Sequence, residues 1–296
     1  MYRPLRHACF LSIPLIVSVA LWGAPAQCSR DADSMYRLAK EYHTGNGKPK
    51  DRHRAFELFK EAAEQGHSVA QFYTALYYDL GYIFEKDRKR AAAWYEKASD
   101  QGQKNARYNL ANLNHYARGI PENRDKAFRL YKEAALQDHV ASEFMVGLYY
   151  DKGYIQRPDP EKAILWYEKA AMEDHVQAQY NLGLLYTGTN HKAYEDMEKA
   201  LWWWLMAALQ EHVPAMADLG LMNIYLGDEK KSRKYLDRGY YWLRKAAFHG
   251  NAESMYHLGM VYHWGSGVPK DPSQARTWFQ RAAEKGNREA EKMLDK

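Results

Sequence analysis

The stretch that decides the fold is VYHWGSGVPKDPSQARTWFQRAAEKG, residues 261–286, because a second copy of it stands near the other end of the chain. Residues 41–66 read EYHTGNGKPKDRHRAFELFKEAAEQG and match the first stretch at 13 of 26 positions without a gap. Glycines beside a lysine can belong to a phosphate-binding loop, but neither the G-x-x-x-x-G-K-[ST] motif nor a preceding strand pattern is present. Recurrence in one register indicates an internal structural repeat instead.

A pair of adjacent small residues, usually Ala-Ala, marks the same point in every copy. Its second member is found at Ala63, Ser99, Ala135, Ala171, Ala208, Ala247 and Ala283. The spacings are 36, 36, 36, 37, 39 and 36 residues, so seven units of 36–39 residues fill residues 32–286. Abundant Ala, Leu, Glu and Lys with few β-branched residues predict two helices in each unit. Residues 27–31 then form a linker, and residues 287–296 supply a C-terminal capping helix.

Recurring residue types indicate what each position in the unit does. Glycine or alanine returns inside the first helix, for example at Gly147 and Gly183, which predicts a contact too close for a larger side chain. Asp or Asn precedes most second helices and predicts an N-cap, while glycines after these helices predict left-handed C-terminal caps. Unit six departs from the pattern through Gly239 and three inserted residues around residues 228–238, so its geometry is the least determined.

The pattern Ala178-x-Tyr180-x-Leu182-Gly183-x-x-Tyr186, together with GSGVPKD and KAILWYEKAA, closely resembles the Sel-one-like repeat (SLR) family, relatives of the tetratricopeptide repeats. The resemblance covers about residues 32–295, although only units one and seven keep the complete Gly-x-Gly loop. It implies an all-α fold, a right-handed α/α superhelical solenoid of about seven helix-turn-helix repeats with a C-terminal capping helix. It also implies an adaptor or scaffold protein, of a kind that bacteria export in several cases.

Residues 1–26 have the organisation of a secretory signal peptide. Arg3 and Arg6 precede an uncharged apolar run at residues 8–22, and Ala24-Pro25-Ala26 provides an A-x-A cleavage signal. A membrane anchor is the weaker alternative, because the run is shorter than the roughly 20 residues that span a bilayer. We therefore expect an exported protein, periplasmic or secreted, with no stable membrane insertion after cleavage. The chain contains no N-x-S/T acceptor, which favours a bacterial envelope.

The charge pattern gives little support for a nucleic-acid partner. Signal cleavage would remove two arginines and lower the formal net charge from +5 to +3. The remaining Lys and Arg are interleaved with Asp and Glu in the manner of solvated helix faces. Cys28 is the only cysteine outside the signal segment, so the cleaved chain would have no internal disulfide. The sequence predicts a protein or peptide partner and no nucleic acid.

The recognisable signatures of catalysis and metal binding are missing from the sequence. No serine has a lysine three residues later, as serine β-lactamases require, and no H-E-x-x-H motif occurs. His67, His139, His175 and His212 recur in the turns between units, where a helix spacing of about 8–10 Å is too wide for a shared metal ion with bonds of about 2 Å. We expect these histidines to cap or pack the turns.

We accordingly predict no catalytic residue, no cofactor and no metal, and hence no enzyme. Some cysteine-rich members of the resembling family are described as β-lactamases. A β-lactamase-like or peptidoglycan-processing hydrolase on the same scaffold is therefore the alternative function.

The best candidate for a binding site is a stripe on the first helices, at the helical spacing i, i+4 and i+7. Its first row is aromatic, and its last row varies between units in a way that architecture alone does not require. We predict that the concave surface of the central units binds a protein or peptide through Tyr108, Asn112, His115, Phe144, Leu148, Asp151, Tyr180 and Thr187.

Three other interpretations of this stripe remain open. The aromatic row can serve packing between units, the polar row can be merely solvent-exposed, and the ligand can bind the convex side. The binding interpretation assumes that His115 and Asp151 have no structural duty, since the repeat does not require either residue.

Overall fold

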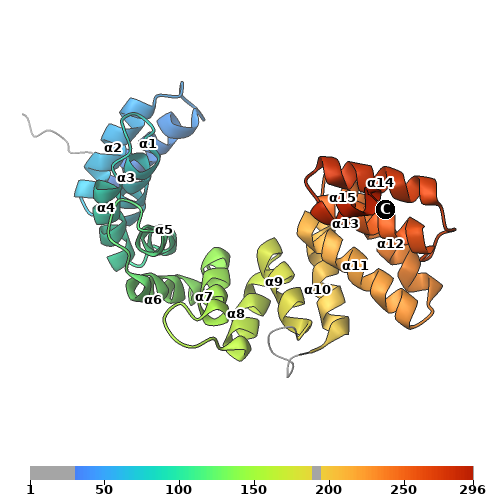
Figure 1. Cartoon of the computed structure of the whole chain (residues 1–296). Coiled ribbons are helices and arrows are strands. Elements are labelled where there is room, and N and C mark those ends of the chain that lie inside the picture. The colour runs from blue at the N-terminus through green and yellow to red at the C-terminus, as the bar shows by residue number, and fades with distance from the viewer. Residues whose placement is uncertain (1–30, 189–194, 296) are drawn as a thin grey trace, which may run out of the picture.

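The computed structural model describes residues 31–188 and 195–295, and every regular element in these two segments is an α-helix. The helices stack into an open arc (Figure 1), which confirms the all-α solenoid expected from the repeat. The predicted signal peptide, residues 1–26, lies outside the described residues, as does most of the linker at residues 27–31. The helices are α1 (Ala32–Thr44), α2 (Arg52–Glu64), α3 (Ser68–Leu80), α4 (Arg88–Asp100), α5 (Lys104–His115), α6 (Arg124–Ala135), α7 (Val140–Lys152), α8 (Pro160–Met172), α9 (Val176–Tyr186), α10 (Met197–Leu209), α11 (Val213–Glu229), α12 (Arg233–Phe248), α13 (Ala252–Trp264), α14 (Pro272–Glu284) and α15 (Arg288–Leu294).

Successive helices form seven pairs, and each helix packs mainly against the helix before it and the helix after it. The odd-numbered first helices α5, α7 and α9 line the inner side of the arc, while α6, α8 and α10 lie on the outer side (Figure 1). The short α15 packs against α14 at the C-terminal end. Each unit therefore buries its apolar face only against its neighbours, as in other solenoids.

The second helices begin where the sequence predicts. The side chain of Asp51 accepts a hydrogen bond from the backbone N–H of Arg54, and Asp159 accepts one from Lys162. Asp87, Asn123, Asp196 and Asp271 cap their helices in the same way. Each bond satisfies an amide of the first turn that has no partner inside its helix, which is worth about 1 kcal/mol. In unit six, Ser232 occupies this place without making the bond.

The second helices end in two different ways. Gly66, Gly102, Gly250 and Gly286 adopt the left-handed conformation that was predicted, with φ between 83° and 91°. In units three, four and five the same place belongs to Asp138, Asp174 and Glu211, at φ values of 54°, 58° and 62°. A side chain other than glycine makes this conformation less favourable by about 1–2 kcal/mol per residue.

The core of each unit centres on one large residue of the second helix. Tyr95, Tyr131 and Tyr167 are fully buried, and Trp204 and Phe279 are buried at the corresponding places in later units. The residues one position earlier are less uniformly buried, since Trp94 and Trp278 are partly exposed. The second helix thus directs its deepest side chain at the first helix of its own unit.

The small residues of the first helices face these large side chains. A Cβ atom added to Gly147 would lie 2.6 Å from Cδ1 of Tyr167, and one added to Gly183 would collide with the indole of Trp204. Gly259 stands in the same relation to Phe279. The prediction that these glycines mark contacts without room for a methyl group is confirmed.

Unit six absorbs its inserted residues by lengthening both helices. α11 and α12 have 17 and 16 residues, against 11 to 13 in the other described paired helices, and only residues 230–232 connect them. Two further close contacts fix this longer pair. A Cβ on Gly227 would meet Leu236, and one on Gly239 would meet Ile224. Gly239, which breaks the sequence pattern, therefore allows the extra turn to pack.

We predict that Gly183→Leu destabilises the protein, because the larger side chain must displace the indole of Trp204 from a filled core. Overpacking of this kind costs about 1–3 kcal/mol, so the melting temperature should fall by several degrees. Thermal unfolding followed by circular dichroism measures the effect. Leu184→Ala, at the exposed neighbouring position, is the control and should change the melting temperature little; equal melting temperatures for Gly183→Leu and the parent would contradict the prediction.

Candidate partner-binding surface

The eight residues predicted to bind a partner lie together on three neighbouring first helices. α5 carries Tyr108, Asn112 and His115; α7 carries Phe144, Leu148 and Asp151; and α9 carries Tyr180 and ends at Thr187. All eight side chains are partly exposed, and their helices line the inner side of the arc (Figure 1). The geometry therefore brings them onto one surface, hereafter the inner row.

The aromatic members of the inner row pack against the turn of the next unit. The ring of Tyr108 lies 4.8 Å from that of His139, and Phe144 stacks on His175 at 4.6 Å, centroid to centroid. Tyr180 contacts His212 in the same way at 4.8 Å, and its hydroxyl donates to Oδ2 of Asp218 at 2.9 Å. One side of each ring thus stabilises the stack of units, while the partial exposure leaves another side available.

The turn histidines themselves are N-caps of the first helices. Nδ1 of His175 accepts a hydrogen bond from the backbone N–H of Ala178 at 3.2 Å, and Nδ1 of His212 accepts one from Ala215. His67 and His139 make the equivalent bonds. The predicted capping role is confirmed. Burial lowers the pKa of His139, His175 and His212, because desolvation disfavours the charged imidazolium.

The histidines of the inner row bond to the following unit. Nδ1 of His115 lies 2.6 Å from the hydroxyl of Tyr149, and the same pair recurs two units earlier, where Nδ1 of His43 lies 2.9 Å from the hydroxyl of Tyr77. Burial lowers the pKa of His115 and raises that of Tyr149, and it raises the pKa of Tyr77 to about 12. Both partners are therefore neutral near pH 7, and the tautomer of the imidazole sets which of the two groups donates.

The aspartates of the inner row bond within their own unit. The hydroxyl of Tyr167 donates to Oδ2 of Asp151 at 3.3 Å, and Asn181 donates to the same hydroxyl at 3.0 Å. Asp79, Tyr95 and Asn109 repeat this arrangement two units earlier. The assumption that His115 and Asp151 have no structural duty is wrong, because both take part in hydrogen bonds that hold helices together.

Sequence reasoning missed this alternation, although the chain displays it. Residues 76–83 read LYYDLGYI and residues 148–155 read LYYDKGYI, two units apart. The tyrosine of each GYI segment lies beside the histidine–tyrosine pair of the same region and carries an arginine. Arg52 lies 4.9 Å over the ring of Tyr82, and Arg124 lies 5.2 Å over that of Tyr154. Across units one to four, the inner surface therefore repeats every two units.

The remaining members of the inner row differ in how firmly they are held. Tyr131 donates to Oδ1 of Asn112 at 2.6 Å, and the hydroxyl of Thr187 donates to the carbonyl of Leu184 at 2.7 Å. Leu148 packs its partly buried side chain against the central core. Every polar member of the inner row is thus oriented by at least one hydrogen bond before any partner arrives.

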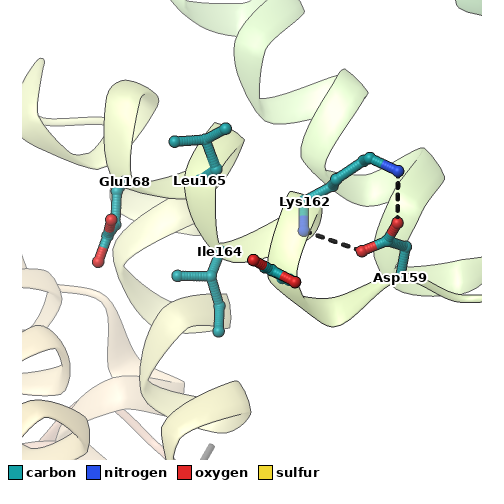
Figure 2. Close-up of a pocket in the computed structure, with 6 residues that line it drawn as sticks. Asp159, Lys162, Ile164, Leu165 and Glu168 are labelled. Atoms are coloured by element: carbon teal, nitrogen blue, oxygen red, sulfur yellow. Dashed lines mark hydrogen bonds and ion pairs between the residues drawn. The ribbon is translucent and has the colours of Figure 1, made fainter.

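A pocket of about 440 Å³ lies elsewhere, on the outer helix α8 (Figure 2). Ile164 and Leu165 line it together with Glu168, while Lys162 is held aside by a 2.7 Å ion pair to Asp159. None of the inner-row residues lines this pocket. Within residues 31–188 and 195–295, no group of three or more His, Cys, Asp or Glu side chains is placed to hold a metal ion. In the same two segments, no helix combines the length and apolar character needed to cross a membrane.

The chain is similar to known repeat proteins along nearly all of its described length. The family model of the Sel1 repeat matches seven times, over residues 32–67, 68–103, 104–139, 140–175, 176–212, 213–251 and 252–287. The structure superposes on a protective antigen of uropathogenic Escherichia coli with an SLR fold, at 28% identity and a TM-score of 0.79, covering 89% of this chain and 56% of that one.

A Sel1 repeat protein from Oxalobacter formigenes gives a TM-score of 0.66 at 28% identity, covering 89% of this chain and 75% of that one. Among curated proteins, chitin synthase regulatory factor 3 of Schizosaccharomyces pombe is 43% identical over 54 residues. That match covers 18% of this chain and only 6% of the yeast protein, so the chain corresponds to a small part of it.

We predict that the turn histidines make stability depend on pH. The pKa of His139, His175 and His212 is lower in the folded than in the unfolded chain, so the unfolded state binds protons first, and stability falls as the pH drops below about 6.5. The double variant His139→Asn with His175→Asn should lose less stability over this range, because Asn251 and Asn287 already cap the equivalent helices without a titrating group. Each protonated cap costs about 1 kcal/mol.

Chemical denaturation at pH 7.5 and pH 5 measures the difference for each protein. His53→Asn, at an exposed position on α2, is the control and should behave as the parent does. An identical loss of stability in the double variant and the parent would show that the histidine caps are not the source.

Proposed function

Because the chain belongs to the Sel1 repeat family, we propose that it is an exported, non-enzymatic scaffold that binds a protein or peptide partner through the inner row. The observation that carries the proposal is the pair of repeated hydrogen-bonded clusters on the inner side of the arc, around His43 and His115. Repeat units need uniform packing to stack. Polar side chains that are partly exposed and fixed in place add something that stacking does not require.

The clusters are suited to binding because their geometry is already set. Tyr149 and Tyr167 are almost completely buried, so they cannot reach a partner, but they fix the orientation of His115 and Asp151. A ligand that meets such side chains loses less conformational entropy on binding than one that must first order them. Tyr108 and Phe144 supply partly exposed aromatic surface beside them, the residue type in which binding hot spots are enriched.

The atoms left over on the inner row match the main chain of a peptide. His115 uses Nδ1 for Tyr149, which leaves Nε2 to donate or accept according to the tautomer. Asp151 uses Oδ2 for Tyr167 and for Lys152, which leaves Oδ1 as an acceptor. A peptide group offers one acceptor and one donor, so an extended segment along the arc can satisfy both. The similarity to an E. coli protein described as a protective antigen supports the exported part of the proposal.

We predict that His115→Ala combined with Asp151→Ala weakens capture of the partner from an envelope extract of the host by about tenfold or more, the loss expected when two oriented polar contacts disappear. The matched control is Tyr149→Phe combined with Tyr167→Phe. It breaks the same two hydrogen bonds from the buried side, together with the bond from Asn181 to Tyr167, and leaves both inner-row side chains in place. It should therefore lower stability at least as much but weaken capture much less. Capture that is equal for the alanine pair and the parent, or equally weak for both pairs, would refute binding by the inner row.

The same purified chain provides the test of the non-enzymatic part. We expect no turnover of a β-lactam or of peptidoglycan above that of a mock purification. Hydrolysis that persisted through purification and was lost on substitution of a single residue would establish the enzyme instead.

We predict that the protein isolated from its host begins at about Gln27 or Cys28, since cleavage after Ala26 removes the signal segment. Mass spectrometry of the intact chain measures this directly. A protein that still carried Met1 would not have been processed as proposed.

A further inference from the structure

Three consecutive turns between units share a pattern that the other turns lack. Residues 136–139 read LQDH, residues 172–175 read MEDH and residues 209–212 read LQEH. Each places an apolar residue first and an acidic residue third. The corresponding turns of units one, two, six and seven read EQGH, DQGQ, FHGN and EKGN, with glycine third. The turns of units three to five, hereafter the turn edge, therefore have a chemistry of their own.

The apolar residues of the turn edge face solvent. Leu136, Met172 and Leu209 are 67%, 70% and 60% exposed, and Phe248 continues the line in unit six at 90%. A single exposed leucine is ordinary on a protein surface. Four such residues at one place in four consecutive units form a row, and aligned apolar exposure of this kind marks interaction sites.

The acidic residues of the turn edge are exposed and have no ion-pair partner among the described residues. They are Asp138, Asp174 and Glu211, and they occupy the left-handed positions that glycine fills in the other four units. A carboxylate therefore occupies each of these turns although its backbone conformation is less favourable in free energy than that of glycine. These charges alternate along the edge with the apolar row.

A buried carboxylate faces a pocket at the middle of the turn edge. Glu143 is only 5% exposed, and its Oε2 has no hydrogen-bond partner within the described part of the chain. It lines a cavity of about 540 Å³ between α7 and the end of α8, together with Asp138, Met172 and Glu173. Lys169 also lines the cavity, but its ammonium group sits 4.5 Å over the ring of Trp166. The cavity therefore combines three carboxylates and one ammonium group with an apolar wall.

The equivalent residues of other units show what Glu143 lacks. Gln71 and Gln179 occupy its place in units two and five, and their amides donate to the carbonyl oxygens of Ala63 and Ala171 at 3.2 and 3.1 Å. An ionised glutamate cannot donate, so it leaves this internal bond unmade and presents an acceptor to the cavity. A buried carboxylate without a partner is unfavourable unless a cation or donor reaches it.

We propose that the turn edge is a second docking surface, occupied by a segment of a partner protein in which apolar and basic residues alternate, with one lysine or arginine entering the cavity to pair with Glu143. The apolar residues of the segment cover Leu136, Met172 and Leu209. Its other basic residues face Asp138, Asp174 and Glu211. A segment with one apolar and one basic residue in every three, about 10 Å of extended chain per triplet, presents both residue types repeatedly along the three turns.

The negative charge of the turn edge favours a basic segment over a second copy of the chain as the occupant. Two copies meeting through their turn edges would bring like-charged carboxylates together, which disfavours association by several kcal/mol. A basic segment meets the same carboxylates with opposite charge. The turn edge shares no residue with the inner row, although Tyr108, Phe144 and Tyr180 pack against its histidines. The proposal neither requires nor excludes the function proposed above.

A synthetic peptide tests the proposal directly. A fluorescent twelve-residue probe of four Leu-Arg-Ser triplets should bind the full chain in anisotropy titrations, whereas probes of Leu-Glu-Ser and Ser-Arg-Ser triplets should bind at least about tenfold more weakly. Glu143→Gln should weaken binding of the Leu-Arg-Ser probe by a similar factor. This variant should fold normally, because glutamine already occupies the same buried place in two other units.

A second variant separates binding from structure. Replacing Asp138, Asp174 and Glu211 by glycine relieves three left-handed backbone positions, so the melting temperature should rise while the affinity for the Leu-Arg-Ser probe falls. The inner-row pair His115→Ala with Asp151→Ala should leave the affinity for this probe unchanged, which distinguishes failure of this proposal from failure of the first. Unchanged affinity in Glu143→Gln, equal binding of the Ser-Arg-Ser probe, or a dimer in sedimentation that Met172→Ser dissociates would overturn the proposal.

Discussion

The contact between a small residue on each first helix and a large side chain on its own second helix is the constraint on which the structure depends. Helices that pack only against neighbours in sequence gain no support from distant parts of the chain. Each unit must therefore fix its own interhelical distance, and units four, five and seven do so by seating Tyr167, Trp204 and Phe279 against a glycine. The position of every side chain on the inner surface follows from that distance.

Much of the fold can be predicted from the sequence because the determining physics is local. The N-caps, the left-handed glycines and the small residues inside helices each act within a few residues or one helix pair, and they recur in the same register from unit to unit. The Asp and Asn caps of the second helices and the contact of Gly183 with Trp204 were predictable for that reason. The histidines of the turns belong to the same class, since each caps the helix that follows it directly.

The inner row shows where this reasoning stops. Its eight residues could be placed on one face from helical spacing, but the partner of His115 is Tyr149, 34 residues away in the next unit. Such a bond depends on how units are rotated against one another, which the period of the repeat does not specify. Glu143 was missed for a related reason. Its place in the sequence resembles that of Gln71, and only the missing hydrogen bond in the structure distinguishes the two.

The two-unit period of the inner surface bears on how a gene of this kind can change length. Within units one to four, loss or duplication of two adjacent units keeps each remaining histidine opposite a tyrosine, as His43 and His115 are now. Loss of the second unit alone would bring His43 opposite Leu113, because Leu113 occupies in unit three the place that Tyr77 has in unit two. A single-unit deletion would preserve the stacking of helices and still lose the histidine–tyrosine pair. In-frame gain or loss by pairs is therefore the step that selection on the inner surface should tolerate, and relatives of different length should differ there by even numbers of units.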